Sequence, residues 1–279
     1  MRRPLKLNSG LVVGGLLSLL FVVGAVGVDW FAPVGPDDGD LLDRLQPPSA
    51  EHLLGTDTLG RDLFWRLVYG ARISLLVGVS SVAAAIVIGA PLGLTAGVLG
   101  GRWDALIMRA MDVLLSVPKI LVAILIMAVT GAGLGNLVFA IALWNVPVFA
   151  RIARSNTLSL RERDFVTAAY AVGASRPRVI LRHVLPNTFG ELIVITSLSI
   201  ATAIMAESGL SFLGLGAPAH LPSWGQTIAE GRPYLRNAPH VTAFGGLFVM
   251  LAVLGFNLLG DGLRDRLDPR SRGATLGEG

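Results

Sequence analysis

Uncharged apolar runs recur along this chain, and they restrict its fold more than any other feature. A helix needs about 20 predominantly apolar residues to cross the hydrocarbon core of a bilayer, and most of these runs approach or exceed that length. Only 15% of the residues are charged, against roughly 25% in soluble domains. The sequence therefore predicts an all-α integral membrane protein. Six transmembrane helices are expected, at Leu11–Val28, Ile73–Leu99, Ala105–Thr130, Leu137–Ile152, Leu192–Ala206 and Val241–Gly260.

Basic residues between the runs indicate the orientation of the chain. Arg2, Arg3 and Lys6 precede the first run, residues 151–186 hold seven arginines, and residues 264–272 hold four. Cytoplasmic segments carry an excess of Lys and Arg, so we expect both termini and the 151–186 loop in the cytoplasm. The first run could instead belong to a cleavable signal peptide. We favour an uncleaved helix because the run is long and further spans follow.

These expectations divide the chain into three parts. Residues 1–72 hold the first transmembrane helix and an extracytoplasmic segment, in which residues 58–69 predict a short amphipathic helix on the membrane surface or against its neighbours. Residues 73–262 form a five-helix core that includes a cytoplasmic loop at 160–187, and residues 263–279 form a cytoplasmic tail. Within the core, Pro91 and Pro118 should bend the second and third spans. On the third span, Arg109 and Asp112 are spaced to form an ion pair.

Patterns for catalysis or metal binding are absent from the sequence. The only lysines are Lys6 and Lys119, and neither belongs to the G-x-x-x-x-G-K-[ST] loop that binds nucleotide phosphates. The four histidines lack the spacing of metal ligands, and there is no cysteine for a thiol or thiolate site. The sequence pI near 10.1 would be compatible with binding to nucleic acid. The basic residues do not form one patch, however, and this argues against that function. We expect no catalytic residue, no metal site and no cofactor bound by this chain.

The loop sequence TAAYAVGASRPRVILRHVLP, residues 167–186, is the most distinctive polar segment. Asp164 can begin a helix because a carboxylate is favoured at the positive end of the helix dipole. Gly173 should end that helix, and Pro177 suits the first turn of a second one. The second element should end at Pro186-Asn187. Small side chains at Ala168 and Ala169 would let a partner approach the backbone, although such a loop could also lie at the lipid headgroups.

This loop resembles the EAA motif of the membrane subunits of ATP-binding-cassette (ABC) importers. That pattern reads E-A-A, three residues, G, nine residues, I-x-L-P. The matching positions are Ala168, Ala169, Gly173, Leu185 and Pro186. Thr167 replaces the glutamate and His183 the isoleucine, and a His-x-Leu-Pro-Asn ending is typical of the peptide-transporting branch.

Other segments between residues 52 and 270 extend the resemblance to the C-type permease subunit of dipeptide, oligopeptide and nickel ABC importers. They read HLLGTDTLGRD, YGARISL, AESGLSFLGLG, PSWG and FNLLGDGLRD. The resemblance implies the ABC importer type I permease fold, in a bacterial or archaeal plasma membrane. It also implies a homologous B-type permease as partner, two ATPase subunits that use ATP and Mg²⁺, and an extracytoplasmic binding protein. The five motif residues would couple the permease to the ATPases.

Several alternatives remain open at this stage. The cargo of such an importer could be a dipeptide, a longer peptide, nickel or another small solute. A stand-alone secondary transporter would show inverted repeats, and none is convincing, while a purely structural membrane scaffold is a third reading. Glu207, at the end of the fifth span, is a candidate for the substrate path because ionisable groups are costly in membranes. A structural role at the helix end is the alternative for Glu207.

Overall fold

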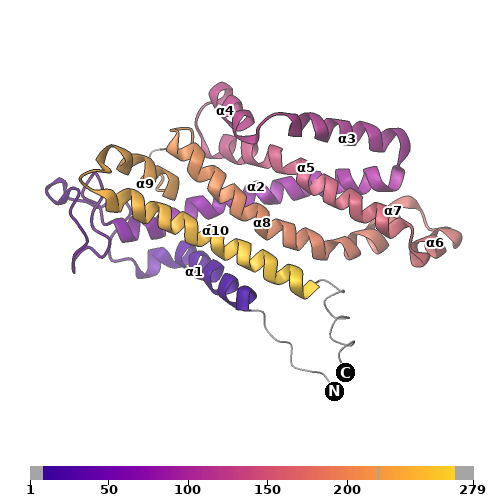
Figure 1. Cartoon of the computed structure of the whole chain (residues 1–279), viewed down its shortest axis with the longest axis horizontal. Helices are drawn as coiled ribbons and strands as arrows, with labels where there is room; N and C mark the ends of the chain where they lie inside the picture. Colours follow the sequence, from indigo (N-terminus) through magenta and orange to yellow (C-terminus); the bar gives the residue numbers. More distant parts are fainter. Residues whose placement is uncertain (1–8, 219, 268–279) are drawn as a thin grey trace, which may run out of the picture.

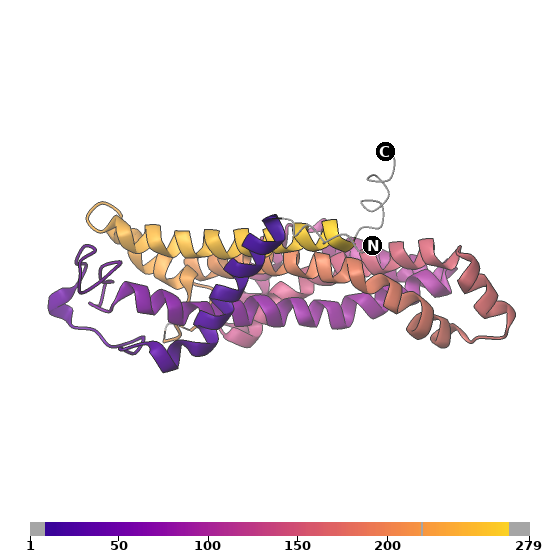
Figure 2. The same ribbon diagram turned by 90° about the horizontal axis from the view of Figure 1, so that it is seen from below.

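The computed structural model describes residues 9–218 and 220–267, and within them long helices run lengthwise through an elongated bundle (Figures 1 and 2). The long helices are α1 (Ser9–Phe31), α2 (Leu63–Leu99), α3 (Gly101–Ser116), α4 (Lys119–Thr130), α5 (Leu134–Arg161), α8 (Leu185–Phe212) and α10 (Pro239–Leu267). Shorter helices are η1 (Leu41–Asp43), α6 (Asp164–Ala171), α7 (Arg176–Val179), η2 (Ile180–Val184), α9 (Trp224–Gly231) and η3 (Arg232–Tyr234). Over these described residues, five helices are long and apolar enough to span a membrane, or six if the bent pair α3–α4 is one span.

The two ends of the bundle differ in what they carry. Figure 1 shows α6 and α7 at one end, and α9 with the segment between α1 and α2 at the other. The segment containing α6 and α7 is therefore held at the tip of the bundle by two long helices, α5 before it and α8 after it.

Close backbone packing joins α2 to α5 along the half of the bundle that leads to α6. A Cβ atom added at Gly93 would lie 2.1 Å from the carbonyl oxygen of Ala150, and one at Gly89 would lie 2.5 Å from that of Val146. Gly97 meets Thr157 in the same way, at 2.5 Å. Small residues allow this approach in membranes, where packing rather than water exclusion holds helices together.

At the opposite end of the bundle, buried ion pairs join α2 and the segment before it to α9. Arg61 Nε lies 2.7 Å from Asp57 Oδ2, and Arg61 Nη2 lies 3.2 Å from Glu230 Oε2 on α9. Arg66 on α2 reaches the same two carboxylates, at 3.3 Å each. Trp224, fully buried at the start of α9, donates its indole N–H to the carbonyl of Leu67 over 2.8 Å. These contacts fix the segment before α2 against α9.

The separate surface helix expected at 58–69 is not formed. Asp57 accepts hydrogen bonds from the backbone N–H groups of Leu59 and Arg61 and holds that stretch in a turn. Asp62 then caps α2 by accepting from Trp65 N over 3.1 Å, so Leu63 begins the long helix itself. The boundary drawn at residue 72 consequently falls inside α2. At the other end, α10 continues to Leu267, and residues 268–279 of the expected tail lie outside the described residues.

The two prolines behave differently from each other. Pro91 lies inside α2, which runs on from Leu63 to Leu99, whereas Pro118 separates α3 from α4 at an angle of 84°.

The expected ion pair between Arg109 and Asp112 is wrong. Asp112 instead pairs with Arg151 of α5 at 2.6 Å, because α3 packs against α5 and the neighbouring helix supplies the cation. A second pair, Asp104 with Arg154 at 2.6 Å between Oδ2 and Nη2, binds the same two helices.

Candidate functional site

The segment between α5 and α8 begins with α6 and a glycine-terminated turn. Asp164 opens α6 as expected, and its carboxylate lies in the first turn. Gly173 has a φ of +84°, in the left-handed region. Its N–H donates to the carbonyl of Tyr170 over 2.9 Å, and Ala174 N donates to that of Ala169 over 3.0 Å. This pair of bonds is a Schellman motif, for which glycine at the turn position is the favoured residue.

The second half of the segment continues into α8 without a break. Pro177 lies in the first turn of α7, as predicted. The helix then widens into the π-helical η2, where Leu185 N donates to the carbonyl of Ile180, and continues as α8. The expected end at Pro186-Asn187 is wrong, since residues Arg176–Phe212 form one candidate span. Proline cannot donate to the carbonyl four residues earlier, and the wider turn just before Pro186 accommodates that loss.

A shallow outer pocket of about 560 Å³ opens on this segment. Its lining residues are Phe165, Ala168, Ala169, Val172, Ala174, Arg178, Arg182 and His183. Phe165 and Val172 are exposed apolar side chains, and the rings of Phe165 and His183 lie 6.3 Å apart. The outer pocket therefore combines apolar, small and basic side chains, a composition that suits the binding of another protein surface.

The structure separates the predicted coupling residues into two groups. Ala168 and Ala169 meet in the outer pocket, and Gly173 forms the turn that follows them. Leu185 and Pro186 lie in the first turn of α8 and do not line this pocket. The motif thus covers both part of the outer pocket and the start of the long helix α8.

Sequence reasoning did not select the arginines and the histidine of the outer pocket as site residues. Arg178, Arg182 and His183 come from α7 and η2, and they reach the same pocket as α6. Their alternation with apolar residues was visible in the sequence. Which face they share with Ala168 depends on the angle between α6 and α7, and spacing alone does not give that angle.

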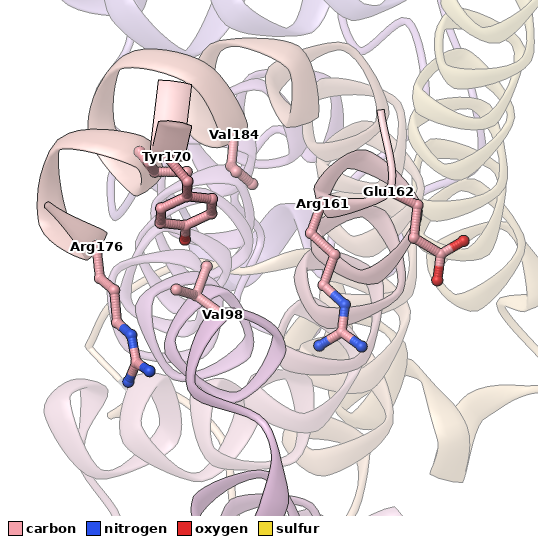
Figure 3. A pocket seen from close by; sticks show the side chains of 7 residues that line it. Val98, Arg161, Glu162, Tyr170, Arg176 and Val184 are labelled. Carbon is pink, nitrogen blue, oxygen red and sulfur yellow. The ribbon is translucent and has the colours of Figure 1, made fainter. Parts of the chain in front are cut away.

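A separate inner pocket of about 400 Å³ lies behind the segment, toward the bundle (Figure 3). It is lined by Val98, Arg161, Glu162, Tyr170, Arg176, Val179 and Val184. None of these residues lines the outer pocket. The segment therefore has two distinct hollowed faces, one toward the outside and one toward the ends of α2 and α5.

Glu207 is placed differently from the expectation that it lines a substrate path. Its side chain is fully buried. Ser74 of α2 donates its hydroxyl to Oε2 over 2.9 Å, and Ser211 of α8 donates to Oε1 over 2.7 Å. Trp224 N of α9 reaches Ser74 Oγ at 3.4 Å. Hydrogen bonds across three helices thus satisfy the carboxyl group inside the chain, and the side chain is not exposed at the surface of the described residues.

Comparison with known proteins identifies relatives over nearly the whole chain. Residues 89–273 match the family described as binding-protein-dependent transport system inner membrane component. The chain is 45% identical to the dipeptide transport system permease protein DppC of Alkalihalophilus pseudofirmus, over 97% of this chain and 89% of that protein. It is 44% identical to the glutathione transport system permease protein GsiD of Escherichia coli O157:H7, over 94% of this chain and 87% of that protein.

Solved structures agree on the fold. An inward-facing conformation of the MetNI methionine ABC transporter superposes with a TM-score of 0.62, covering 74% of this chain and 98% of that one. The sequence identity in that comparison is 18%, so the likeness concerns the arrangement of helices alone.

Proposed function

This chain belongs to the family of binding-protein-dependent transport system inner membrane components, and from that premise we propose that it is the permease subunit of an ABC importer for short peptides. It forms one half of the path across the membrane and hydrolyses no ATP itself. The outer pocket on the α6–η2 segment carries the proposal, because it is the surface that a separate ATPase subunit would grip.

The names of two relatives support a peptide as the cargo. One is called a dipeptide permease and the other a glutathione permease, and both cargoes are short peptides in the chemical sense. A nickel or other small-solute importer is the alternative within the same family. The described residues contain no group of three potential metal-ligating side chains, but a permease that passes metal need not hold it.

The proposed assembly contains a homologous B-type permease, two ATPase subunits and an extracytoplasmic binding protein. Family membership supports the binding protein, since the family is described by dependence on one. The likeness in fold to a subunit of an ABC transporter supports the ATPase subunits. The exposed apolar side chains of α3 and α4, among them Leu106, Val113 and Leu125, are available for lipid or for the second permease. In the assembly, ATP and Mg²⁺ are used by the ATPase chains.

The proposed orientation places the α6–η2 segment and both termini in the cytoplasm. The seven arginines of residues 151–186 support it, because basic residues accumulate on the cytoplasmic side. The segment before α2 and helix α9 then face outward, where the binding protein would arrive.

Within this assembly, Ala168 and Ala169 provide the close contact with the ATPase. Gly173 sets the angle between the two halves of the segment. Leu185 and Pro186 pass the displacement to α8, with which they are continuous. A load applied at the outer pocket would thus move a transmembrane helix directly.

Purification of the chain with its candidate partners tests this proposal. The assembly is reconstituted in vesicles with the binding protein, and ATP hydrolysis is measured with dipeptides, with glutathione and with Ni²⁺. Stimulation by a peptide and not by Ni²⁺ is expected. Stimulation by Ni²⁺ alone would assign a metal cargo, and uptake by this chain without any ATPase would show a secondary transporter instead.

A further inference from the structure

The inner pocket has the composition of a site for a phosphate-bearing lipid, and the geometry points to an anionic phospholipid of the cytoplasmic leaflet as its occupant. This inference rests on the proposed orientation of the chain, but not on its cargo. It concerns the face of the α6–η2 segment that is opposite the proposed ATPase contact.

Two arginines line the pocket, together with the one carboxylate of Glu162. Figure 3 shows Arg161 and Arg176 on either side of Val98, with both guanidinium groups extending in the same direction, while the carboxylate of Glu162 turns away. Among the ion pairs of the described residues, neither arginine takes part in any. Arg161 makes one long hydrogen bond, from Nη1 to the carbonyl of Gly97 at 3.4 Å. Their remaining donors are free to bind an anion, and guanidinium forks match phosphate oxygens.

An aromatic hydroxyl and an apolar wall complete the site. In Figure 3, the side chain of Tyr170 on α6 points toward Val98, and its hydroxyl group lies between the two arginines in that view. Val98 of α2, Val179 of α7 and Val184 of η2 supply the apolar part of the lining. A free inorganic anion gains nothing from three valines, whereas a phospholipid can set its phosphate on the arginines and its glycerol and first methylenes against the valines.

The depth of the pocket agrees with the headgroup layer. Arg72 pairs with Asp29 at 2.8 Å where α1 ends and the uncharged part of α2 begins, which marks the outer border of the hydrocarbon. Val98 lies roughly 39 Å further along α2 at about 1.5 Å per residue. Measured from that border, the hydrocarbon core extends about 30 Å and the cytoplasmic headgroup layer ends at about 35–38 Å. A helix tilted by about 20°, the average for membrane spans, covers about 37 Å of that depth over this length. The pocket therefore falls among the cytoplasmic headgroups, where basic pockets between transmembrane helices bind anionic lipids.

Native mass spectrometry of the purified full-length chain tests the site. The detergent-solubilised protein is titrated with phosphatidylglycerol and, separately, with phosphatidylcholine. The test variant is R161Q/R176Q. The matched control is R102Q/R109Q, which removes the same charge from exposed arginines of α3 that line neither pocket.

The wild type and the R102Q/R109Q control should prefer phosphatidylglycerol, and R161Q/R176Q should bind it about tenfold or more weakly, since each basic group near an anionic headgroup contributes about fivefold. Tyr170→Phe, which removes only a hydroxyl group, should show a smaller loss and keeps the test valid if the double variant misfolds. Equal losses in both double variants would overturn the site, because the effect would then be general charge attraction. Displacement of the lipid by inorganic phosphate would overturn the lipid assignment.

This measurement needs neither peptide nor ATPase. A failure here would leave the proposed transport function untouched. Conversely, a chain that bound phosphatidylglycerol as expected but copurified with no ATPase would support the lipid site and contradict the transport proposal.

Discussion

Glu207 shows at the scale of one residue how a buried polar group can join helices in a membrane. Its carboxyl group accepts hydrogen bonds from Ser74 on α2 and Ser211 on its own helix, and the start of α9 is tied to Ser74. A buried group that loses its partners retains the full cost of leaving water. The buried serine hydroxyls therefore need the Glu207 carboxyl group as their acceptor, just as that group needs the hydroxyls as donors.

Replacing Glu207 with alanine should destabilise the protein by roughly 1–3 kcal/mol, because the serine hydroxyls lose their acceptor. Glu207→Gln keeps the volume and one acceptor oxygen and should cost clearly less. Thermal unfolding of both variants in detergent measures the difference. If Glu207 instead contacts substrate, peptide uptake would fall in both variants while the unfolding temperature stayed at the wild-type value.

Gly173 carries a second prediction at this scale. No atom lies within 4 Å of a Cβ added there, and the φ of +84° is the sole obstacle to a side chain. Gly173→Val should distort the turn and reduce peptide-stimulated ATP hydrolysis, since a β-branched residue strongly disfavours positive φ. Gly173→Asn should retain most of the activity, because asparagine visits this region readily. Equal activity in the two variants would show that the turn does not matter for coupling.

Helices pack in this bundle through glycines that lie on specific faces. In α1, Gly14 faces α10, where an added Cβ would lie 2.4 Å from the backbone nitrogen of Leu259. The next residue, Gly15, has nothing within 4 Å. On α10, Gly262 approaches Leu11 of α1 in turn, at 2.6 Å. A glycine on each of the two helices thus lets the backbone of the other helix come close.

Gly14→Leu should separate α1 from α10 and lower stability by about 1–3 kcal/mol or more, the usual cost of overpacking. Gly15→Leu adds the same side chain one residue later, into open space, and should change stability little. Unfolding temperatures in detergent compare the two. Equal destabilisation would mean that the cost comes from losing a glycine in the helix and not from the contact with α10.

The spans themselves could be predicted from the sequence, because their apolar length is a direct consequence of bilayer thickness. What could not be predicted depends on neighbouring elements. The start of α2 at Leu63 follows from the turn around Asp57, and the Arg151–Asp112 pair follows from α3 lying against α5. The sequence placed Glu207 near a helix end, but it held no sign that Ser74, far away in the chain, would enclose it.

The candidate site was predicted in part for a similar reason. Ala168, Ala169 and Gly173 form a local pattern, and their local consequences, a short helix and a left-handed turn, are present. Pro186 was expected to stop a helix, yet it lies in the first turn of α8, after a π-helical stretch. That wider turn is a property of the continuous helix, which the spacing of the motif does not show.

The molecule as a whole has a cap of buried ion pairs at one end and the α6–η2 segment at the other, joined by long helices (Figure 2). The cap is fixed by buried ion pairs around Arg66, and the α6–η2 segment is continuous with α8. A displacement of that segment can therefore reach the opposite end through α8, and α5 is tied to α2 by backbone contact. This arrangement suits the proposed transporter, whose ATPases are separate chains.

Peptide uptake and ATP hydrolysis, measured together in vesicles that contain the reconstituted assembly, test this central claim most directly. Two variants of α6 are compared: Ala168→Trp, in the outer pocket, and Ala171→Trp, at an exposed position that lines neither pocket. Ala168→Trp should abolish peptide uptake and its link to ATP hydrolysis because the large ring obstructs the ATPase contact, while Ala171→Trp should retain both. Uptake that remains at the wild-type rate in Ala168→Trp would contradict the account.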